Sequence, residues 1–161
     1  MFSVFALGAL ALVVPFIGFG GPSYDRVAAD AAKMYNLDIK NYEVIVAHNI
    51  VNASGEHVLG MYRVSTTSGP QSIFIQKSWS RPMVIATIFH EFAHAAQRAH
   101  NLDRGGLNDE QHAEVLSFQT MWHSKYAYNA VHLLWLHLFA KPAEYRATHA
   151  IWRMAFNGGK Q

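Results

Sequence analysis

The chain contains no cysteine, which excludes a disulfide framework, a zinc ribbon and thiol catalysis. Charged residues are scarce, at 15% of the 161 residues, against about 25% in an average soluble protein. Apolar residues make up 51% of the chain, whereas a disordered chain has low hydrophobicity and high charge. The composition therefore predicts one folded domain with a sizeable core.

A basic surface is also missing. The 13 Lys and Arg residues exceed the 11 Asp and Glu residues by only two charges, and no basic run occurs. Proteins that hold nucleic acid electrostatically need such a surface, so we expect no nucleic-acid partner. Histidine, in contrast, is abundant at 10 residues, and it is the commonest metal ligand in proteins.

The N-terminal segment is apolar, with no charge from residue 2 to residue 21. About 20 such residues suffice to cross a bilayer as a helix, so the segment predicts a membrane anchor. A cleaved signal peptide is the first alternative, because Gly18 and Gly20 offer small residues before a cut, although no basic residue precedes the run. A buried or partner-facing helix is the second. We expect a membrane-anchored or exported protein, with segment 1–21 followed by a folded domain at 22–161.

Within that domain, hydrophobic periodicity and turn residues outline the elements. The predicted helices lie at 24–36, 83–101, 108–126, 130–140 and 142–156, and the predicted strands at 42–47, 58–65 and 71–76. The short turn at residues 68–70 suits a hairpin between the last two strands. The pattern predicts an α+β fold with a small, mainly antiparallel sheet packed on the helix at 83–101, and with further C-terminal helices.

The helix predicted at 83–101 contains His90-Glu91-Phe92-Ala93-His94, an H-E-x-x-H motif. Positions four apart share one helix face, so both imidazoles reach one ion. Zinc lowers the pKa of its bound water to about 7, and Glu91 is placed to act as general base and then as general acid. The apolar flanks indicate that this helix is buried. The motif predicts zinc-dependent hydrolysis of peptide bonds.

Two His residues leave a third ligand to be found, and we favour His112. If Val115, Phe118, Trp122 and Tyr126 form the buried stripe of the next helix, His112 falls within or beside that stripe. The glycine-containing turn before this helix lets it fold back toward the motif. His112 is therefore expected to complete the zinc site with His90 and His94.

Three other residues compete for the same place. Glu114 lies at the opposite edge of the assumed stripe, and Glu110 lies toward solvent. His100 has metzincin spacing, but that pattern needs a helix-breaking Gly where this chain has Gln97. We rank these residues behind His112, with Glu114 first among them.

The motif region resembles the SprT-like zinc metallopeptidases. Residues 86–95 (ATIFHEFAHA) match the apolar-T-x-x-H-E-x-x-H-A run of that family, and residues 71–78 (QSIFIQKS) are similar to its preceding edge-strand segment. The family's third ligand is a His at the start of the next helix, which His112 matches, although Ala113 and Leu116 depart from the family pattern. The resemblance implies a zincin-like fold, Zn2+ and metallopeptidase activity over about residues 24–125.

A rival resemblance is to the gluzincins, whose Glu ligand lies at the spacing of Glu114. The segment Glu110-x-x-Ala113-Glu114 is also similar to the E-x-x-A-D segment of some integral-membrane zincins.

We expect a zinc metallopeptidase that acts on proteins or peptides. Extended substrate would pair with the sheet edge near residues 73–75, and Tyr126 and His123 are candidates, by position alone, for stabilising the oxyanion. The alternative is a membrane-attached zinc-binding protein without turnover. An intact Glu91 argues against it, because a structural site needs no general base.

Overall fold

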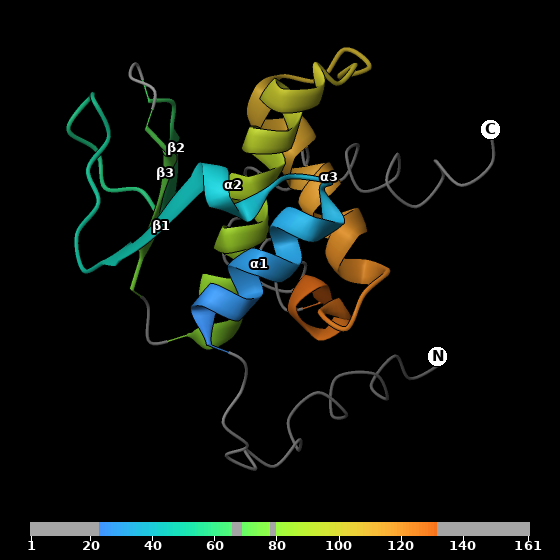
Figure 1. The fold of residues 1–161 in the computed structure, drawn as a ribbon, viewed down its shortest axis with the longest axis horizontal. Helices are drawn as coiled ribbons and strands as arrows, with labels where there is room; N and C mark the ends of the chain where they lie inside the picture. The colour runs from blue at the N-terminus through green and yellow to red at the C-terminus, as the bar shows by residue number, and fades with distance from the viewer. Residues whose placement is uncertain (1–22, 66–68, 78–79, 132–161) are drawn as a thin grey trace, which may run out of the picture.

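The computed structural model describes residues 23–65, 69–77 and 80–131, and its architecture is α+β (Figure 1). The elements in chain order are α1 (Tyr24–Met34), the 3-10 helix η1 (Ile39–Asn41), β1 (Tyr42–Ala47), β2 (Gly60–Arg63), β3 (Gln71–Gln76), α2 (Arg81–His100) and α3 (Asp109–Trp122). The expected anchor at 1–21, the helix at 142–156 and most of the helix at 130–140 lie outside the described residues. Within the described ranges, no helix is both long and apolar enough to span a membrane.

The sheet is mixed, which corrects the expectation that it is mainly antiparallel. Its order is β1-β3-β2, with β1 parallel and β2 antiparallel to β3. The antiparallel pairing of β2 with β3 confirms that part of the prediction. The parallel pair arises because β3 carries the fully buried Ile73 and Ile75 and takes the centre, which separates β1 from β2. Residues 73–75 therefore lie in the central strand, whereas a free edge was expected there for substrate pairing. The strand β2 lies at an edge of the sheet instead.

Helix α2 lies at the centre of the described fold (Figure 1). It contacts α1, α3, β2 and β3. The largest fully buried side chains come mainly from α2 and β3, and include Ile73, Ile75, Val84, Ile88, Phe89 and Phe92. The motif helix α2 thus packs against the sheet and against both neighbouring helices, and these contacts fix its residues relative to the sheet and to α3.

The bounds of α2 follow from local sequence. Ser80 lies at the N-cap, and Pro82 lies in the first turn, where its missing N–H costs nothing. Asn101 adopts a left-handed conformation with a φ of 48° and ends the helix. These bounds confirm the predicted motif helix almost residue for residue.

Helix α3 starts as predicted but buries a different face. Asn108 and Gln111 form a reciprocal capping box at its start. The buried residues of α3 are Ala113, Ser117, Phe118 and Met121, whereas Trp122 is 41% exposed. The stripe assumed from large apolar residues is therefore right for Phe118 and Tyr126, which are buried, and wrong for Trp122. The small side chains of Ala113 and Ser117 allow α3 to pack closely on α2, and this rotation decides which residues of α3 face the motif.

Candidate metal centre

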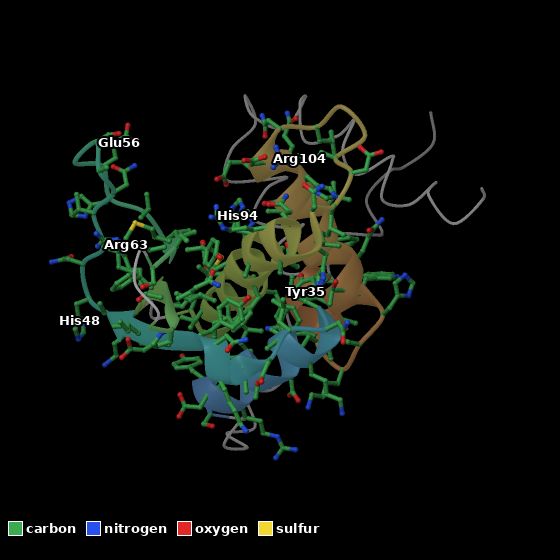
Figure 2. All side chains as sticks on the ribbon, turned by 45° about the horizontal axis from the view of Figure 1, so that its top comes forward. Tyr35, His48, Glu56, Arg63, His94 and Arg104 are labelled. Carbon is green, nitrogen blue, oxygen red and sulfur yellow. The ribbon has the colours of Figure 1, made fainter. Side chains whose placement is uncertain are left out.

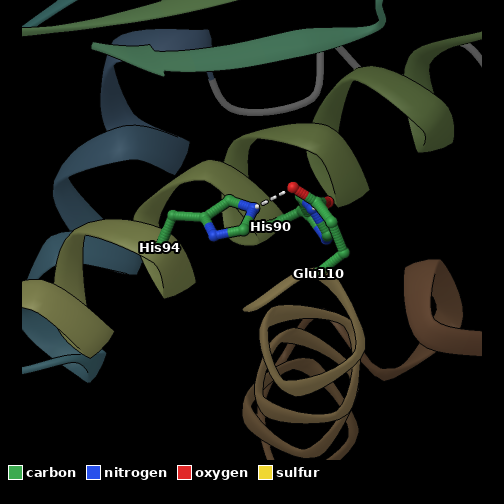
Figure 3. Close-up of side chains that lie close together, drawn as sticks. All are labelled: His90, His94 and Glu110. Atoms are coloured by element: carbon green, nitrogen blue, oxygen red, sulfur yellow. Dashed lines mark hydrogen bonds and ion pairs between the residues drawn. The ribbon is translucent and has the colours of Figure 1, made fainter. Parts of the chain in front are cut away.

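His90 and His94 project from one face of α2 toward α3 (Figure 3). His94 lies on the side of α2 away from α1 and Tyr35 (Figure 2). The two imidazole rings are edge to face, with centroids 4.8 Å apart. Their side chains are 20% and 16% exposed, so each ring is mostly buried but reachable from solvent.

Glu110, in the first turn of α3, faces both rings (Figure 3). Its Oε2 lies 3.2 Å from His90 Nε2, and its Oε1 lies 3.3 Å from His94 Nε2. One ligand atom from each of the three residues falls within 4.8 Å of the others. Ligands about 2.0–2.1 Å from a tetrahedral ion lie about 3.3 Å apart. The three side chains therefore fit a single metal ion, and two His with one carboxylate are ligands that zinc accepts.

The charges at this cluster favour an ionised carboxylate. Hydrogen bonds to His90 and His94 hold the pKa of Glu110 well below its usual range. Burial lowers the pKa of His90, but the hydrogen bond to Glu110 and the charges of Glu91, Glu114 and Glu110 outweigh it, so the net shift is upward. Protons and a metal ion therefore compete for the same nitrogen.

Glu91 lies on the sheet side of the same helix. It is only 5% exposed and accepts a hydrogen bond from the backbone N–H of Tyr62 in β2. Burial raises its pKa above the ordinary value, against the opposing effect of His90 and His94. Its burial and its place next in sequence to His90 make Glu91 the candidate general base of this site.

Oxygen atoms also lie near the second nitrogen of each ring. His94 Nδ1 is 3.0 Å from Gln97 Oε1, and His90 Nδ1 is 3.7 Å from Glu114 Oε2. The Gln97 oxygen is within hydrogen-bond distance of Nδ1, so it favours a proton there and leaves Nε2 as the atom at which a metal ion would replace the proton shared with Glu110. Both rings are thus oriented with Nε2 toward Glu110.

The structure does not bring His112, the third ligand favoured from sequence, into this group. His112 Nδ1 lies 3.0 Å from Gln97 Nε2 instead. Residues two apart on a helix do not share a face, so the rotation that turns Glu110 toward α2 turns His112 aside. The cue in the sequence was the pair of small residues Ala113 and Ser117, which mark the face of closest packing.

The remaining candidates lie elsewhere. His100 contacts the backbone oxygen of Tyr35 at 2.9 Å, at the end of α1. The hydroxyl of Tyr126 donates to Asp30 Oδ2 at 2.6 Å, which engages it with α1 rather than with the cluster. His123 is the C-cap residue of α3. None of these contacts places an oxyanion-stabilising group at the cluster.

Comparison with known proteins adds no relative: no family model, no curated protein and no solved structure matches the chain. What the site does is therefore inferred from its geometry.

Proposed function

We propose that this protein is a zinc metallopeptidase in which His90, His94 and Glu110 hold the ion and Glu91 is the general base. The observation that carries the proposal is the Glu110 carboxylate, which lies 3.2 and 3.3 Å from the two Nε2 atoms. The buried Glu91 next in sequence to His90 supplies the second requirement of such a site.

Zinc, when bound, polarises a substrate carbonyl and makes water acidic enough to lose a proton near neutral pH. Glu91 accepts that proton at its carboxylate and delivers it to the leaving amine. Burial, which raises the pKa of Glu91, moves it toward the working pH of a proton shuttle. A purely structural metal site gains nothing from a buried carboxylate, so Glu91 also favours turnover over metal binding alone.

The substrate-binding surface we propose is the edge strand β2. Gln76 N–H donates to Leu59 C=O at 2.8 Å, and this bond sets the alternation along the antiparallel pair. It follows that the backbone groups of Gly60 and Tyr62 point away from β3; the Tyr62 N–H meets Glu91, and the other groups face the edge of the sheet formed by the described strands. An extended peptide that added to this edge would run beside Glu91.

The three proposed ligands, His90, His94 and Glu110, can be compared with those of the two families that the sequence resembles. Two His and one Glu are the ligand types of the gluzincins, although Glu110 stands four residues before the gluzincin spacing, at which Glu114 lies, whereas the SprT-like family uses a third His. Glu110 also stands at the first position of the segment similar to E-x-x-A-D. The α+β fold, with a small sheet beside the motif helix, supports a zincin-like assignment in either case. We therefore propose a zincin of gluzincin type.

The uncharged stretch at residues 2–21 supports attachment to a membrane, or export, of this peptidase. Its substrates would then be proteins or peptides near a membrane or outside the cytoplasm. The near balance of acidic and basic residues supports a protein substrate rather than nucleic acid.

The direct test is cleavage of casein by the full-length protein. We expect zinc-loaded parent protein to cleave casein, a chelator to stop cleavage, and added zinc to restore it. Glu91→Gln, prepared in parallel, controls for a contaminating peptidase and should be inactive. Cleavage that survives both the chelator and the Glu91→Gln change would overturn the proposal.

A further inference from the structure

Gln97 connects the two halves of the candidate metal centre. It is buried, with 6% of its surface exposed, and it lies one turn beyond His94 in α2. Its Oε1 is 3.0 Å from His94 Nδ1. Its Nε2 is 2.9 Å from the Asp109 carbonyl oxygen and 3.0 Å from His112 Nδ1. One side chain thus contacts a motif histidine and the first turn of α3.

The chemistry of these partners fixes which way the Gln97 amide points. A backbone carbonyl only accepts hydrogen bonds, so the Gln97 atom beside the Asp109 oxygen is the NH₂ group. The atom beside His94 is then the amide oxygen, which only accepts. His94 Nδ1 must therefore carry a hydrogen, and in the neutral ring the Nε2 atom keeps its lone pair.

His94 Nε2 is the atom that faces the metal centre, and a metal ion bound there would replace the proton that Nε2 shares with the Glu110 carboxylate. His94 Nε2 is 3.3 Å from Glu110 Oε1, on the side of the ring that faces the cluster. The same Gln97 amide holds the carbonyl of Asp109, the residue before Glu110 in the chain. The position of Glu110 relative to His94 is thus set through a side chain that is not itself a ligand.

We propose that Gln97 is a positioning residue, which holds a proton on His94 Nδ1, so that Nε2 faces the metal centre, and aligns the start of α3 so that Glu110 meets the two imidazoles. His112, on this account, is a hydrogen-bond acceptor for Gln97 rather than a ligand. The inference rests on the metal-binding part of the proposed function, and it does not depend on peptide cleavage. Loss of such an outer partner weakens metal affinity by about 10–100-fold.

The first test needs no variant. Two-bond ¹H–¹⁵N correlation spectra of the metal-free, full-length parent report which nitrogens of each ring carry a proton. We expect His94 Nδ1 to carry a proton for Gln97 Oε1, whether or not Nε2 also carries one for Glu110. A His94 ring protonated at Nε2 alone would overturn the proposal.

The second test measures zinc affinity by competition with a chromophoric chelator. Gln97→Leu has similar bulk and no hydrogen bonds, and it should bind zinc about 10–100-fold more weakly. Gln97→Glu keeps an oxygen that faces His94, so it should retain the proton on His94 Nδ1 while losing the donor to Asp109. If the Leu variant does not fold, the zinc affinity of Gln97→Glu still measures the loss of the donor to Asp109.

His112→Ala is the matched control, because it removes one partner of Gln97 and leaves the bonds to His94 and Asp109. It should change zinc affinity by only a few-fold. Parent-like affinity in Gln97→Leu, or a loss in His112→Ala as large as that in His94→Ala, would overturn the proposal. Failure of the peptidase proposal would be seen separately, as zinc-loaded parent that cleaves nothing.

Discussion

Gly60 of β2 lies directly against the carboxylate of Glu91. A Cβ at residue 60 would fall 2.6 Å from Thr87 Cγ2 and closer still to Glu91 Oε1, and real Cβ atoms are not found so close to their neighbours. The edge strand reaches the motif helix only because this residue has no side chain. The proposed substrate edge and the proposed base therefore form one surface.

Gly60→Ala should destabilise the protein and impair cleavage together. Overpacking of this kind typically costs about 1–3 kcal/mol, and the displaced Glu91 would no longer face the cluster. Urea unfolding of metal-free protein measures the cost. In a Glu91→Ala background one of the two clashes is gone, so the same substitution should cost less. An equal cost in both backgrounds would show that Gly60 and Glu91 do not contact each other.

Glu91→Gln should abolish hydrolysis while it stabilises the metal-free fold. Cleavage should fall by at least about 10²–10⁴-fold, the usual contribution of a general acid–base group. Burial raises the pKa of Glu91, so the ionised form costs stability above the folded pKa and costs nothing below the ordinary value of about 4.3. Thermal unfolding should show a more stable variant at neutral pH and no difference near pH 4. A variant less stable than the parent at neutral pH would contradict this.

Glu110→Gln should weaken zinc binding far more than Glu114→Gln. Glu110 contacts both Nε2 atoms, whereas Glu114 lies 3.7 Å from His90 Nδ1, on the outer side of the ring. We expect a loss of more than about 100-fold for Glu110→Gln, and about 10–100-fold for an outer partner such as Glu114. The two variants remove the same charge from the same helix, so each controls for the other. A reversed order would make Glu114 the ligand.

Asp30→Asn should flatten the acid end of the stability profile. Hydrogen bonds to Lys125 and Tyr126 lower the pKa of Asp30, and the contacts of both partners with Asp30 Oδ2 are 2.6 Å. A lowered acid pKa gives stability that is present above the unfolded value, about 3.9, and is lost as the pH falls through the folded value. Denaturant unfolding from pH 5 downward should show a smaller loss for Asp30→Asn than for the parent. The exposed Asp25 of the same helix gives the control, and Asp25→Asn should behave like the parent.

Residues 1–21 should direct the full-length protein to membranes. The uncharged run at residues 2–21 is long enough to cross a bilayer. After expression, high-speed centrifugation without detergent should pellet the protein, and detergent should release it. A mature N-terminus near Gly21 would support the signal-peptide alternative. Full-length protein that stays in the supernatant would contradict the anchor.

The elements that depend on local sequence were predictable. The strands at 42–47 and 71–76 have the observed bounds, because each is a short β-branched run bounded by turn residues. The motif helix and the Asn108 cap were also predicted correctly. In each case the residues that decide the structure lie within a few positions of the element.

The order of the strands and the facing side of α3 were not predictable in the same way. Both depend on which surfaces pack together, and hydrophobic size misled the assignment. Trp122 looked like a core residue and is 41% exposed, while Ala113 and Ser117 are fully buried. Small residues carry little hydrophobic signal, yet they allow two helices to approach closely. The rotation they impose turns Glu110, rather than His112, toward the two histidines.

The most direct test of the metal centre is X-ray diffraction from zinc-loaded crystals of the full-length protein, with anomalous data collected on both sides of the zinc absorption edge. We predict one zinc peak per chain, about 2.0–2.2 Å from the Nε2 atoms of His90 and His94 and from a carboxylate oxygen of Glu110. No protein chain atom is expected at the fourth position. A peak coordinated by His112 or Glu114 in place of Glu110, or no zinc peak between α2 and α3, would contradict this account.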